Sequence, residues 1–212
     1  MAHSRPFIVI GSGGHAKVVI DTLHAIGHSI LFCTDVNESR CGVKVCDVRV
    51  AGHDDLIDDQ SPTDVYLANG LGSIGVPALR KKIYSEWTEK GFEFSTIVHP
   101  TAFVSPTANL GLGTQIMAGA VVQTSANVGA NSIVNTRASI DHDCSIGEHC
   151  HIAPGVTISG SVATGDLCHV GTGACIIQSI KIGNRVVVGS GATVIRDVPD
   201  DLIVTGIPAK PR

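Results

Sequence analysis

The chain has 212 residues, of which 43% are hydrophobic and 16% are charged, and its formal net charge is −4. This balance excludes a disordered chain, and without a block of like charge the sequence has no basic cluster that would indicate nucleic-acid binding. Met1 to Pro6 are mostly polar and no apolar run reaches the length of a membrane span, so we expect a cytoplasmic protein without membrane association. Seven cysteines without a CxxC pair indicate thiols in a reducing compartment, and neither a disulfide framework nor a zinc ribbon.

The first third of the chain has the pattern of a small α/β domain. The apolar run Phe7–Ile10 predicts a strand, and residues 17–23 predict a helix that Gly27 would end. Further strands are predicted at residues 30–33, 65–68 and 92–98, and a second helix from about residue 76 to residue 90. Strands that alternate with helices are typical of a parallel sheet, so we expect a half-Rossmann, nucleotide-sugar-binding domain over residues 1–97.

A glycine turn follows the first predicted strand. Gly11, Gly13 and Ala16 fit the pattern G-x-G-x-x-[GA], and Asp35 lies about twenty residues further on, as in dinucleotide-binding turns. Such a turn presents backbone N–H groups to phosphate. Because only half of a dinucleotide fold is present, we expect a nucleotide with Asp35 near its base or sugar. A purely structural turn and an NAD site stay open as alternatives.

Residues 98–194 carry an uninterrupted six-residue repeat. From Val98 onward, sixteen of the seventeen residues at every sixth position are aliphatic, and Thr164 is the exception. A mostly small residue follows each of these positions by four. Glycine recurs every eighteen residues, at positions 111, 129, 147, 165 and 183. This pattern excludes collagen, which needs glycine at every third residue, and disfavours an antiparallel sandwich, which needs a period of two.

The repeat predicts a parallel β-helix. Each hexad would supply one short strand, with its aliphatic side chain inside a narrow prism and the small residue at a tight corner. Glycine would lie where a corner needs a positive φ or a close approach of backbones. Three hexads would close one coil of eighteen residues, which gives about five coils. Cys144, Cys150 and Cys168 fall at small positions, so we expect core residues.

Several motifs along the chain resemble one family. They are Gly11-Ser12-Gly13-Gly14-His15, Asn69-Gly70, Arg80-Lys81-Lys82-Ile83-Tyr84, Ile97-Val98-His99-Pro100, Asn135 to Asp143, Gly147, His151-Ile152-Ala153-Pro154-Gly155, and Gly206-Ile207-Pro208-Ala209-Lys210. With the domain order, they resemble the hexapeptide-repeat acyltransferases, in the subgroup of sialic-acid O-acetyltransferases and of N-acetyltransferases for nucleotide-linked 4-amino sugars, such as those of bacillosamine and perosamine synthesis. The resemblance implies a left-handed β-helix with a C-terminal tail over residues 98–212, a homotrimer with active sites at subunit interfaces, acetyl-CoA as co-substrate, and no metal.

The resemblance also implies roles for individual residues. The catalytic residues would be His142 as general base, Asp143 as its acidic partner, and Asn135. The residues that bind acetyl-CoA would be His151, Thr172, Gly189, Ser190 and Lys210. The residues that bind the nucleotide sugar would be Gly13, Gly14, His15, Asp35, Val36 and Gly70.

The repeat predicts independently how His142 is oriented. Ile140 and Cys144 occupy inward positions, so His142 should point outward beside Asp143, and Cys144 is disfavoured as a nucleophile. Neighbouring carboxylates can fix the tautomer of an imidazole and raise its basicity, so that it takes a proton from an attacking amine. His151 lies half a coil further on, so the two histidines could share a site only across a subunit boundary.

The resemblance implies direct acetyl transfer to the 4-amino group of a nucleotide-linked 4-amino-4,6-dideoxy sugar, either a UDP-4-amino sugar or GDP-perosamine, for surface glycan and lipopolysaccharide synthesis. The alternatives are a sialic-acid-type O-acetyltransferase, a non-catalytic β-helix scaffold, and a carbonic anhydrase with zinc on His142, His149 and His151. The sequence does not decide among UDP, GDP and CMP as the carrier, or between an amine and a hydroxyl as the acceptor.

Overall fold

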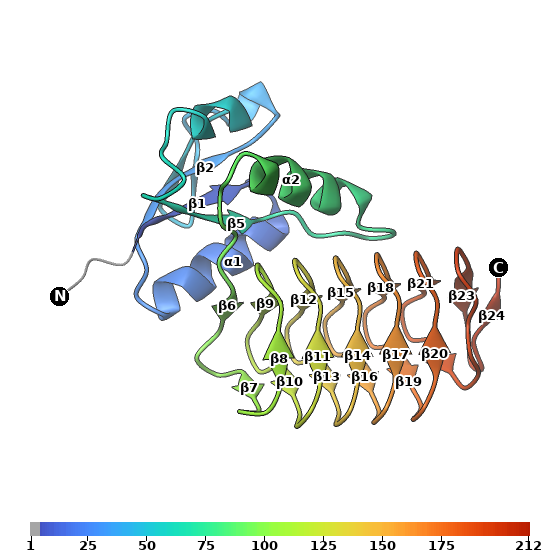
Figure 1. Ribbon diagram of the computed structural model, residues 1–212. Helices are drawn as coiled ribbons and strands as arrows, with labels where there is room; N and C mark the ends of the chain where they lie inside the picture. The colour runs from blue at the N-terminus through green and yellow to red at the C-terminus, as the bar shows by residue number, and fades with distance from the viewer. Residues whose placement is uncertain (1–4) are drawn as a thin grey trace.

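In the computed structural model, residues 5–212 form an α/β domain and a long prism of stacked coils (Figure 1). The α/β domain lies over the end of the prism where the coils begin, and the C-terminus lies at the opposite end. Residues 1–4, most of the polar start on which the expectation of a cytoplasmic protein was partly based, lie outside the described residues. Within the described part, no helix is both long and apolar enough to cross a membrane.

The α/β domain is built on one five-stranded sheet with the order β3-β4-β2-β1-β5. Its strands, α-helices and 3-10 helices (η) are β1 (Phe7–Ile10), α1 (Gly14–Ala25), β2 (Ile30–Thr34), η1 (Glu38–Arg40), β3 (Lys44–Val45), β4 (Val48–Gly52), η2 (Asp54–Ile57), β5 (Tyr66–Asn69) and α2 (Ala78–Glu89). The pairs β1–β2, β1–β5 and β2–β4 are parallel, whereas β3 and β4 form an antiparallel hairpin.

Both faces of this sheet are covered, which explains why β1 is apolar at every position. Phe7 and Val9 pack in the cluster that contains the buried residues of α1, and Ile8 and Ile10 pack in the cluster that contains Trp87 of α2. Since successive side chains of a strand point to opposite faces, this alternation places one helix on each side of the sheet. The glycine turn after β1 leads directly into α1.

Three of the strands predicted for this domain and both predicted helices are confirmed within a few residues, but the β3–β4 hairpin was missed. Val45, Val48 and Val50 are buried and alternate with the exposed Lys44 and Arg49, but the two strands are only two and five residues long. Cys46 and Asp47 take the positive φ values of its turn, although neither residue is glycine or asparagine. The hairpin therefore shows none of the turn signals that sequence reading relies on.

The strand predicted over residues 92–98 is correct only at its last two residues. Only Ile97–Val98 forms a strand, β6, and it pairs with the prism instead of the α/β sheet. Phe94 makes one isolated bridge with Leu67. The apolar residues of this segment are buried because Phe92 and Phe94 fill the cluster under α2, so apolarity there reflects packing and not strand pairing. The expected boundary between residues 97 and 98 falls inside β6 and stays a prediction.

The prism has three faces, each a sheet of short strands. Face 1 contains β6 (Ile97–Val98), β9 (Gln115–Ile116), β12 (Ile133–Val134), β15 (His151–Ile152), β18 (His169–Val170), β21 (Val187–Val188), β23 (Ile203–Thr205) and β24 (Lys210–Pro211). Face 2 contains β7 (Phe103–Val104), β10 (Val121–Val122), β13 (Ser139–Ile140), β16 (Thr157–Ile158), β19 (Cys175–Ile176) and β22 (Thr193–Val194). Face 3 contains β8 (Asn109–Leu110), β11 (Asn127–Val128), β14 (Ser145–Ile146), β17 (Ala163–Thr164) and β20 (Lys181–Ile182).

The coils stack in the register that the repeat predicts. Val121 pairs with Ser139 and Val122 with Ile140, eighteen residues apart in each case, and the pairing is parallel. β24 alone in the prism is antiparallel, to β23. From Ile116 to Val194, every sixth residue is buried inside the prism, and the aliphatic residues of the first coil are partly buried. Cys144, Cys150 and Cys168 are fully buried, as predicted.

The two roles expected of glycine fall at different positions of the repeat. The glycines with a period of eighteen are needed for close approach, since a Cβ on Gly129 would lie 2.5 Å from the carbonyl carbon of Gly147. Positive φ values instead recur every six residues, and non-glycine residues such as Asn131 (φ 54°) and Asp143 (φ 60°) adopt many of them. The corners therefore tolerate polar side chains, which allows them to carry a site.

Candidate functional site

A cavity of about 270 Å³ opens at the carboxyl ends of β1, β2 and β5. All six residues expected to bind the nucleotide sugar line it, namely Gly13, Gly14, His15, Asp35, Val36 and Gly70. The cavity lies where the strand order reverses, because β2 and β5 flank β1 on opposite sides. Ligands of open parallel sheets bind at such a point.

Asp35 holds the glycine turn in place. Its Oδ2 accepts hydrogen bonds from the Ser12 N–H, at 3.1 Å, and from the Ser12 hydroxyl, and its Oδ1 accepts one from the Asn37 N–H at 2.9 Å. Arg40 adds hydrogen bonds from Nε to Ser12 Oγ (3.0 Å) and from Nη2 to Ser12 O (2.8 Å). Burial opposes ionisation of Asp35, but the hydrogen bonds from Ser12 and Asn37 outweigh it and lower the pKa of this carboxyl.

A second pocket continues the first toward the prism. The two share Gly14, His15 and Gly72, and the second is also lined by Asn135 and His151. His15 lies between the pockets, with its Nε2 2.8 Å from Gln115 Oε1 of β9. A ligand held at the glycine turn therefore has a continuous path to the corner of the prism between faces 1 and 2.

Hydrogen bonds fix the tautomer of His151. Asn135 Oδ1 accepts the Thr136 N–H at 2.7 Å, so Asn135 Nδ2 must donate to His151 Nε2 at 3.0 Å. The proton of a neutral His151 then lies on Nδ1 and is donated to the Ser73 hydroxyl at 3.0 Å, and Ser73 can donate in turn to His169 Nδ1 at 3.1 Å.

Burial keeps these histidines neutral. It lowers the pKa of His151 to about 3 and the pKa of His15 to about 4, and the positive charge of Arg80 contributes in both cases. Since the tautomer and the charge of His151 are both fixed, this side chain is suited to orienting a ligand more than to transferring protons.

His142 and Asp143 lie at a different corner, between faces 2 and 3. His142 Nδ1 is 2.8 Å from Asp143 Oδ2, and the two side chains are 54% and 60% exposed. The hydrogen bond to Asp143 raises the pKa of His142. With Nδ1–H donated to the carboxylate, Nε2 carries the lone pair of the neutral imidazole and is available as a base. The outward orientation predicted for His142 is confirmed.

Gly160 provides the space for the His142 ring in the next coil. A Cβ at Gly160 would lie 2.5 Å from His142 Cε1 and 2.6 Å from Nε2. Among the described residues, the Gly160 N–H donates no hydrogen bond, although Gly160 O accepts one from Ser179. A free backbone donor therefore lies close to the candidate base.

The residues expected to bind acetyl-CoA follow one corner of the prism. Thr172, Gly189 and Ser190 lie at the corner between faces 1 and 2, where the Gly191 N–H donates to Thr172 O at 2.8 Å. Asn135 follows β12 at the same corner in an earlier coil, and His151 lies beside it in β15. Lys210 lies in β24, at the last coil. The structure thus places Asn135, Thr172, Gly189 and Ser190 along one edge of face 2, and His142 at the other edge.

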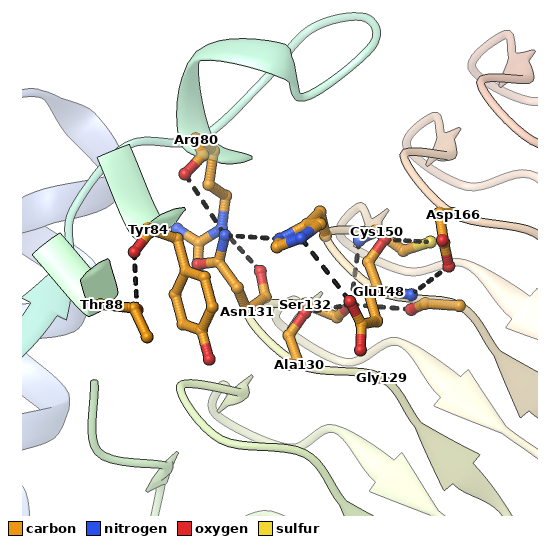
Figure 2. Close-up of polar contacts among 12 residues, drawn as sticks. Arg80, Tyr84, Thr88, Gly129, Ala130, Asn131, Ser132, Glu148, Cys150 and Asp166 are labelled. Atoms are coloured by element: carbon orange, nitrogen blue, oxygen red, sulfur yellow. Dashed lines mark hydrogen bonds and ion pairs between the residues drawn. The ribbon is translucent and has the colours of Figure 1, made fainter. Parts of the chain in front are cut away.

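A buried arginine, which the sequence reading did not assign to the site, joins the two parts of the molecule (Figure 2). Arg80 of α2 is 1% exposed and forms no ion pair with a carboxylate among residues 5–212. Its Nε donates to Asn131 O of the prism at 2.9 Å, and its Nη1 donates to Asn69 O and Leu71 O at 2.8 Å each. Burial lowers its pKa to about 9. Arg80 therefore fastens the segment after β5, which lines both pockets, to the prism.

The histidines of the carbonic anhydrase alternative lie apart in the fold. His142 contacts Asp143, whereas His149 contacts Asn131 and His151 contacts Ser73. Among residues 5–212, no group of three or more His, Cys, Asp or Glu side chains has the arrangement of a metal site.

Two family models match the chain. Residues 6–87 match the PglD N-terminal domain, and residues 125–160 match the bacterial transferase hexapeptide model of six repeats. No curated protein sequence matches significantly.

Solved structures match over nearly the whole chain. Perosamine N-acetyltransferase from Caulobacter crescentus, solved with CoA and GDP-perosamine, is 34% identical with a TM-score of 0.90, over 98% of this chain and 96% of the other. The acetyltransferase domain of PglB from Neisseria gonorrhoeae, solved with acetyl coenzyme A, is 36% identical with a TM-score of 0.92, over 99% and 100%. WeeI from Acinetobacter baumannii, at 22% identity and a TM-score of 0.88 over 99% and 100%, shares the fold. The predicted fold class is thus confirmed, and the chain belongs to the hexapeptide-repeat acetyltransferases that carry a PglD-type N-terminal domain.

Proposed function

We propose that the protein is an N-acetyltransferase that transfers the acetyl group of acetyl-CoA to the 4-amino group of a nucleotide-linked 4-amino-4,6-dideoxy sugar, in a cytoplasmic step of surface glycan or lipopolysaccharide synthesis. The continuity of the two pockets through Gly14, His15 and Gly72 carries this proposal. A nucleotide held at the glycine turn would direct its sugar to the prism corner with Asn135. The similarity to perosamine N-acetyltransferase supports the class of acceptor.

The two edges of face 2 support a homotrimer with shared active sites. In one chain, Asn135 and His151 lie at one edge, and His142 lies at the other edge. A neighbouring subunit that places its His142 edge against the Asn135 edge of the first would complete the site. Cyclic symmetry would repeat this contact around a closed ring, and three subunits is the arrangement implied by the resemblance.

The corner between faces 1 and 2 fits an extended acyl donor. Gly155, Gly173 and Gly191 form its turns with positive φ, and an added Cβ would meet nothing within 4 Å at any of them. The corner is therefore bare backbone that a pantetheine chain could approach closely. Thr172 and Ser190 supply hydroxyls beside this path, and Lys210 at the last coil supplies a positive charge for the phosphates of CoA.

The proposed chemistry is a direct transfer. The amine attacks the thioester carbonyl while His142 Nε2 accepts its proton, and Asp143 stabilises the resulting imidazolium through Nδ1. The Gly160 N–H could donate to the oxygen of the tetrahedral intermediate, where one such donor contributes about 3 kcal/mol. Collapse breaks the C–S bond, and the leaving thiolate takes up the proton from His142. Asn135, tied to His151, would orient the acetyl or sugar group.

The test is an acetylation assay with purified protein, acetyl-CoA, and nucleotide-linked sugars that carry either an amine or a hydroxyl at position 4. We expect release of free CoA thiol and a monoacetylated product with the amino sugars alone. Acetylation of a sialic acid hydroxyl instead would favour the O-acetyltransferase alternative. If no acceptor released CoA and calorimetry detected no acetyl-CoA binding, the protein would be a scaffold and the proposal would be wrong.

A further inference from the structure

The nucleotide cavity extends along the carboxyl edge of the sheet beyond the glycine turn. In the order β4-β2-β1-β5, the turn with Gly13 follows β1, Asp35 follows β2, and Asp54 follows β4. All three residues line the same cavity. The cavity therefore runs across three neighbouring strand ends, from the glycine turn to Asp54.

A nucleotide has a fixed order of phosphate, ribose and base, which this edge can match in only one direction. Phosphate is suited to the backbone N–H groups of the glycine turn. The sugar beyond the diphosphate must extend toward His15 and the prism, since the second pocket lies on that side. The ribose then falls near Asp35, as in related nucleotide-binding sheets, and the base falls near Asp54.

Asp54 is a hydrogen-bond acceptor without a cationic partner. It is half-buried, and its Oδ1 accepts the Thr34 hydroxyl. None of the ion pairs among residues 5–212 involves Asp54, and its Oδ2 accepts no hydrogen bond there. A carboxylate in this state has free lone pairs toward the cavity, and a ligand with N–H donors would satisfy them.

The walls beside Asp54 are apolar and exposed. Val36 is 79% exposed and Leu79 is 60% exposed, and both line the cavity together with Ile83. Exposed aliphatic side chains around a polar group are typical of a ligand pocket that receives a flat ring, because the ring removes their surface from water. The Asp54 end of the cavity thus has the character of a nucleobase pocket.

The hydrogen-bonding pattern of the bases distinguishes them at a carboxylate. Guanine presents two adjacent donors, N1–H and the 2-amino group, which match the two oxygens of a carboxylate. Uracil presents one N–H between two carbonyl oxygens, and these would be repelled by the carboxylate. Cytosine and adenine each present an amino group beside a ring nitrogen that is an acceptor. We propose that Asp54 selects guanine and that the acceptor sugar is carried by GDP, a proposal that rests on the proposed function.

The test is isothermal titration calorimetry of the full-length protein with GDP, UDP and CDP, without any sugar or acetyl-CoA. We expect GDP to bind at least about tenfold more tightly than UDP or CDP, since hydrogen bonds to a charged group contribute about 1.5–3 kcal/mol. Asp54→Asn should weaken the binding of GDP by about 10- to 100-fold, because the amide keeps one acceptor and loses the charge. The binding of UDP should stay unchanged or become tighter. Asp55→Asn is the matched control, since Asp55 is exposed and outside the cavity, and it should bind GDP normally.

Three results would overturn the inference: equal or tighter binding of UDP by the unmodified protein, no binding of GDP, or an equal loss for all nucleotides in Asp54→Asn, which would show a structural role. The proposed function fails separately. Tight GDP binding without acetylation of any GDP-linked amino sugar would contradict the transferase and leave the guanine pocket standing. Efficient acetylation of a UDP-linked amino sugar with weak GDP binding would support the transferase and contradict the guanine pocket.

Discussion

The two edges of face 2 carry the two kinds of site residue in contrasting surroundings. At the edge under the α/β domain, His151 is 6% exposed, neutral, and bound to Asn135 and Ser73. At the other edge, His142 is 54% exposed and contacts a single carboxylate. Burial lowers the pKa of the first histidine, and the hydrogen bond to Asp143 raises the pKa of the second. The same residue type on the same repeat is thus suited to positioning at one edge and to proton transfer at the other.

The difference originates in what covers each edge. The α/β domain and its Arg80 network desolvate the first edge, whereas His142 at the second edge stays 54% exposed among residues 5–212. Asp143 and the space at Gly160 hold the His142 ring, and a ligand or a neighbouring subunit would be needed to exclude water from this edge. Four substitutions or conditions test this contrast, in order of expected effect.

The largest effect is expected for His142→Ala. Loss of a general base usually lowers turnover by about 10²- to 10⁴-fold. We expect a fall in kcat of this size, with little change in the binding of acetyl-CoA, in steady-state assays of free thiol release. His169→Ala, at the other edge, is the comparison and should reduce kcat far less. A near-normal kcat in His142→Ala would show that His142 is not the general base.

A smaller effect is expected for Arg80→Met, which keeps an unbranched apolar stem but removes the hydrogen-bond donors. The segment Asn69–Leu71 would then be less firmly held, so we expect KM for the nucleotide sugar to rise by roughly tenfold or more, in line with the loss of charged hydrogen bonds. KM for acetyl-CoA should change little. Lys81→Met, at an exposed neighbour, is the control. Equal increases in both KM values would show that Arg80 supports the fold and not the acceptor side.

The buried edge predicts a loss of stability in acid. His15 and His151 have folded-state pKa values well below the ordinary 6.5, so the unfolded chain binds more protons below pH 6.5 and the free energy of unfolding falls there. The loss begins near pH 6.5 and continues to about pH 3–4. At pH 5.5, each of these two neutral histidines lowers the free energy of unfolding by about 1.4 kcal/mol relative to its value well above pH 6.5. Denaturant titrations should show a shallower pH dependence in His151→Asn, and an unchanged slope would contradict this assignment.

The smallest effect concerns the pH dependence of kcat, which we expect His142 at the exposed edge to set. Activity requires His142 without its proton, so kcat should rise with pH through the pKa of His142, which Asp143 raises above the ordinary value. Asp143→Asn should move this rise to lower pH and lower the plateau. Asp141→Asn should move it less, because Asp141 accepts a hydrogen bond from the backbone N–H of His142 and reaches the imidazole only through its charge, whereas Asp143 accepts a hydrogen bond from the ring. A shift to higher pH in Asp143→Asn would contradict the proposed role.

The sequence by itself determined the prism, because a six-residue period repeats one local structure and each coil pairs with the next by the same register. It also determined that His142 faces outward, since inward positions follow from the period. The glycine turn after β1 and the alternation of strands and helices likewise indicated the nucleotide side. These features depend on residues close together in the chain or at fixed spacing.

Tertiary structure alone decided which distant residues meet. Arg80 contacts Asn131 across 51 positions, and Ser73 contacts His169 across 96, and no period or motif relates these pairs. The same holds for Asp54, which enters the cavity because β4 pairs with β2, in a hairpin that the sequence did not reveal. Burial, and with it the neutral state of His151, depends on the α/β domain packing over face 1. Local pattern fixes the shape of each element, but the desolvation that sets the chemistry comes from contacts between elements.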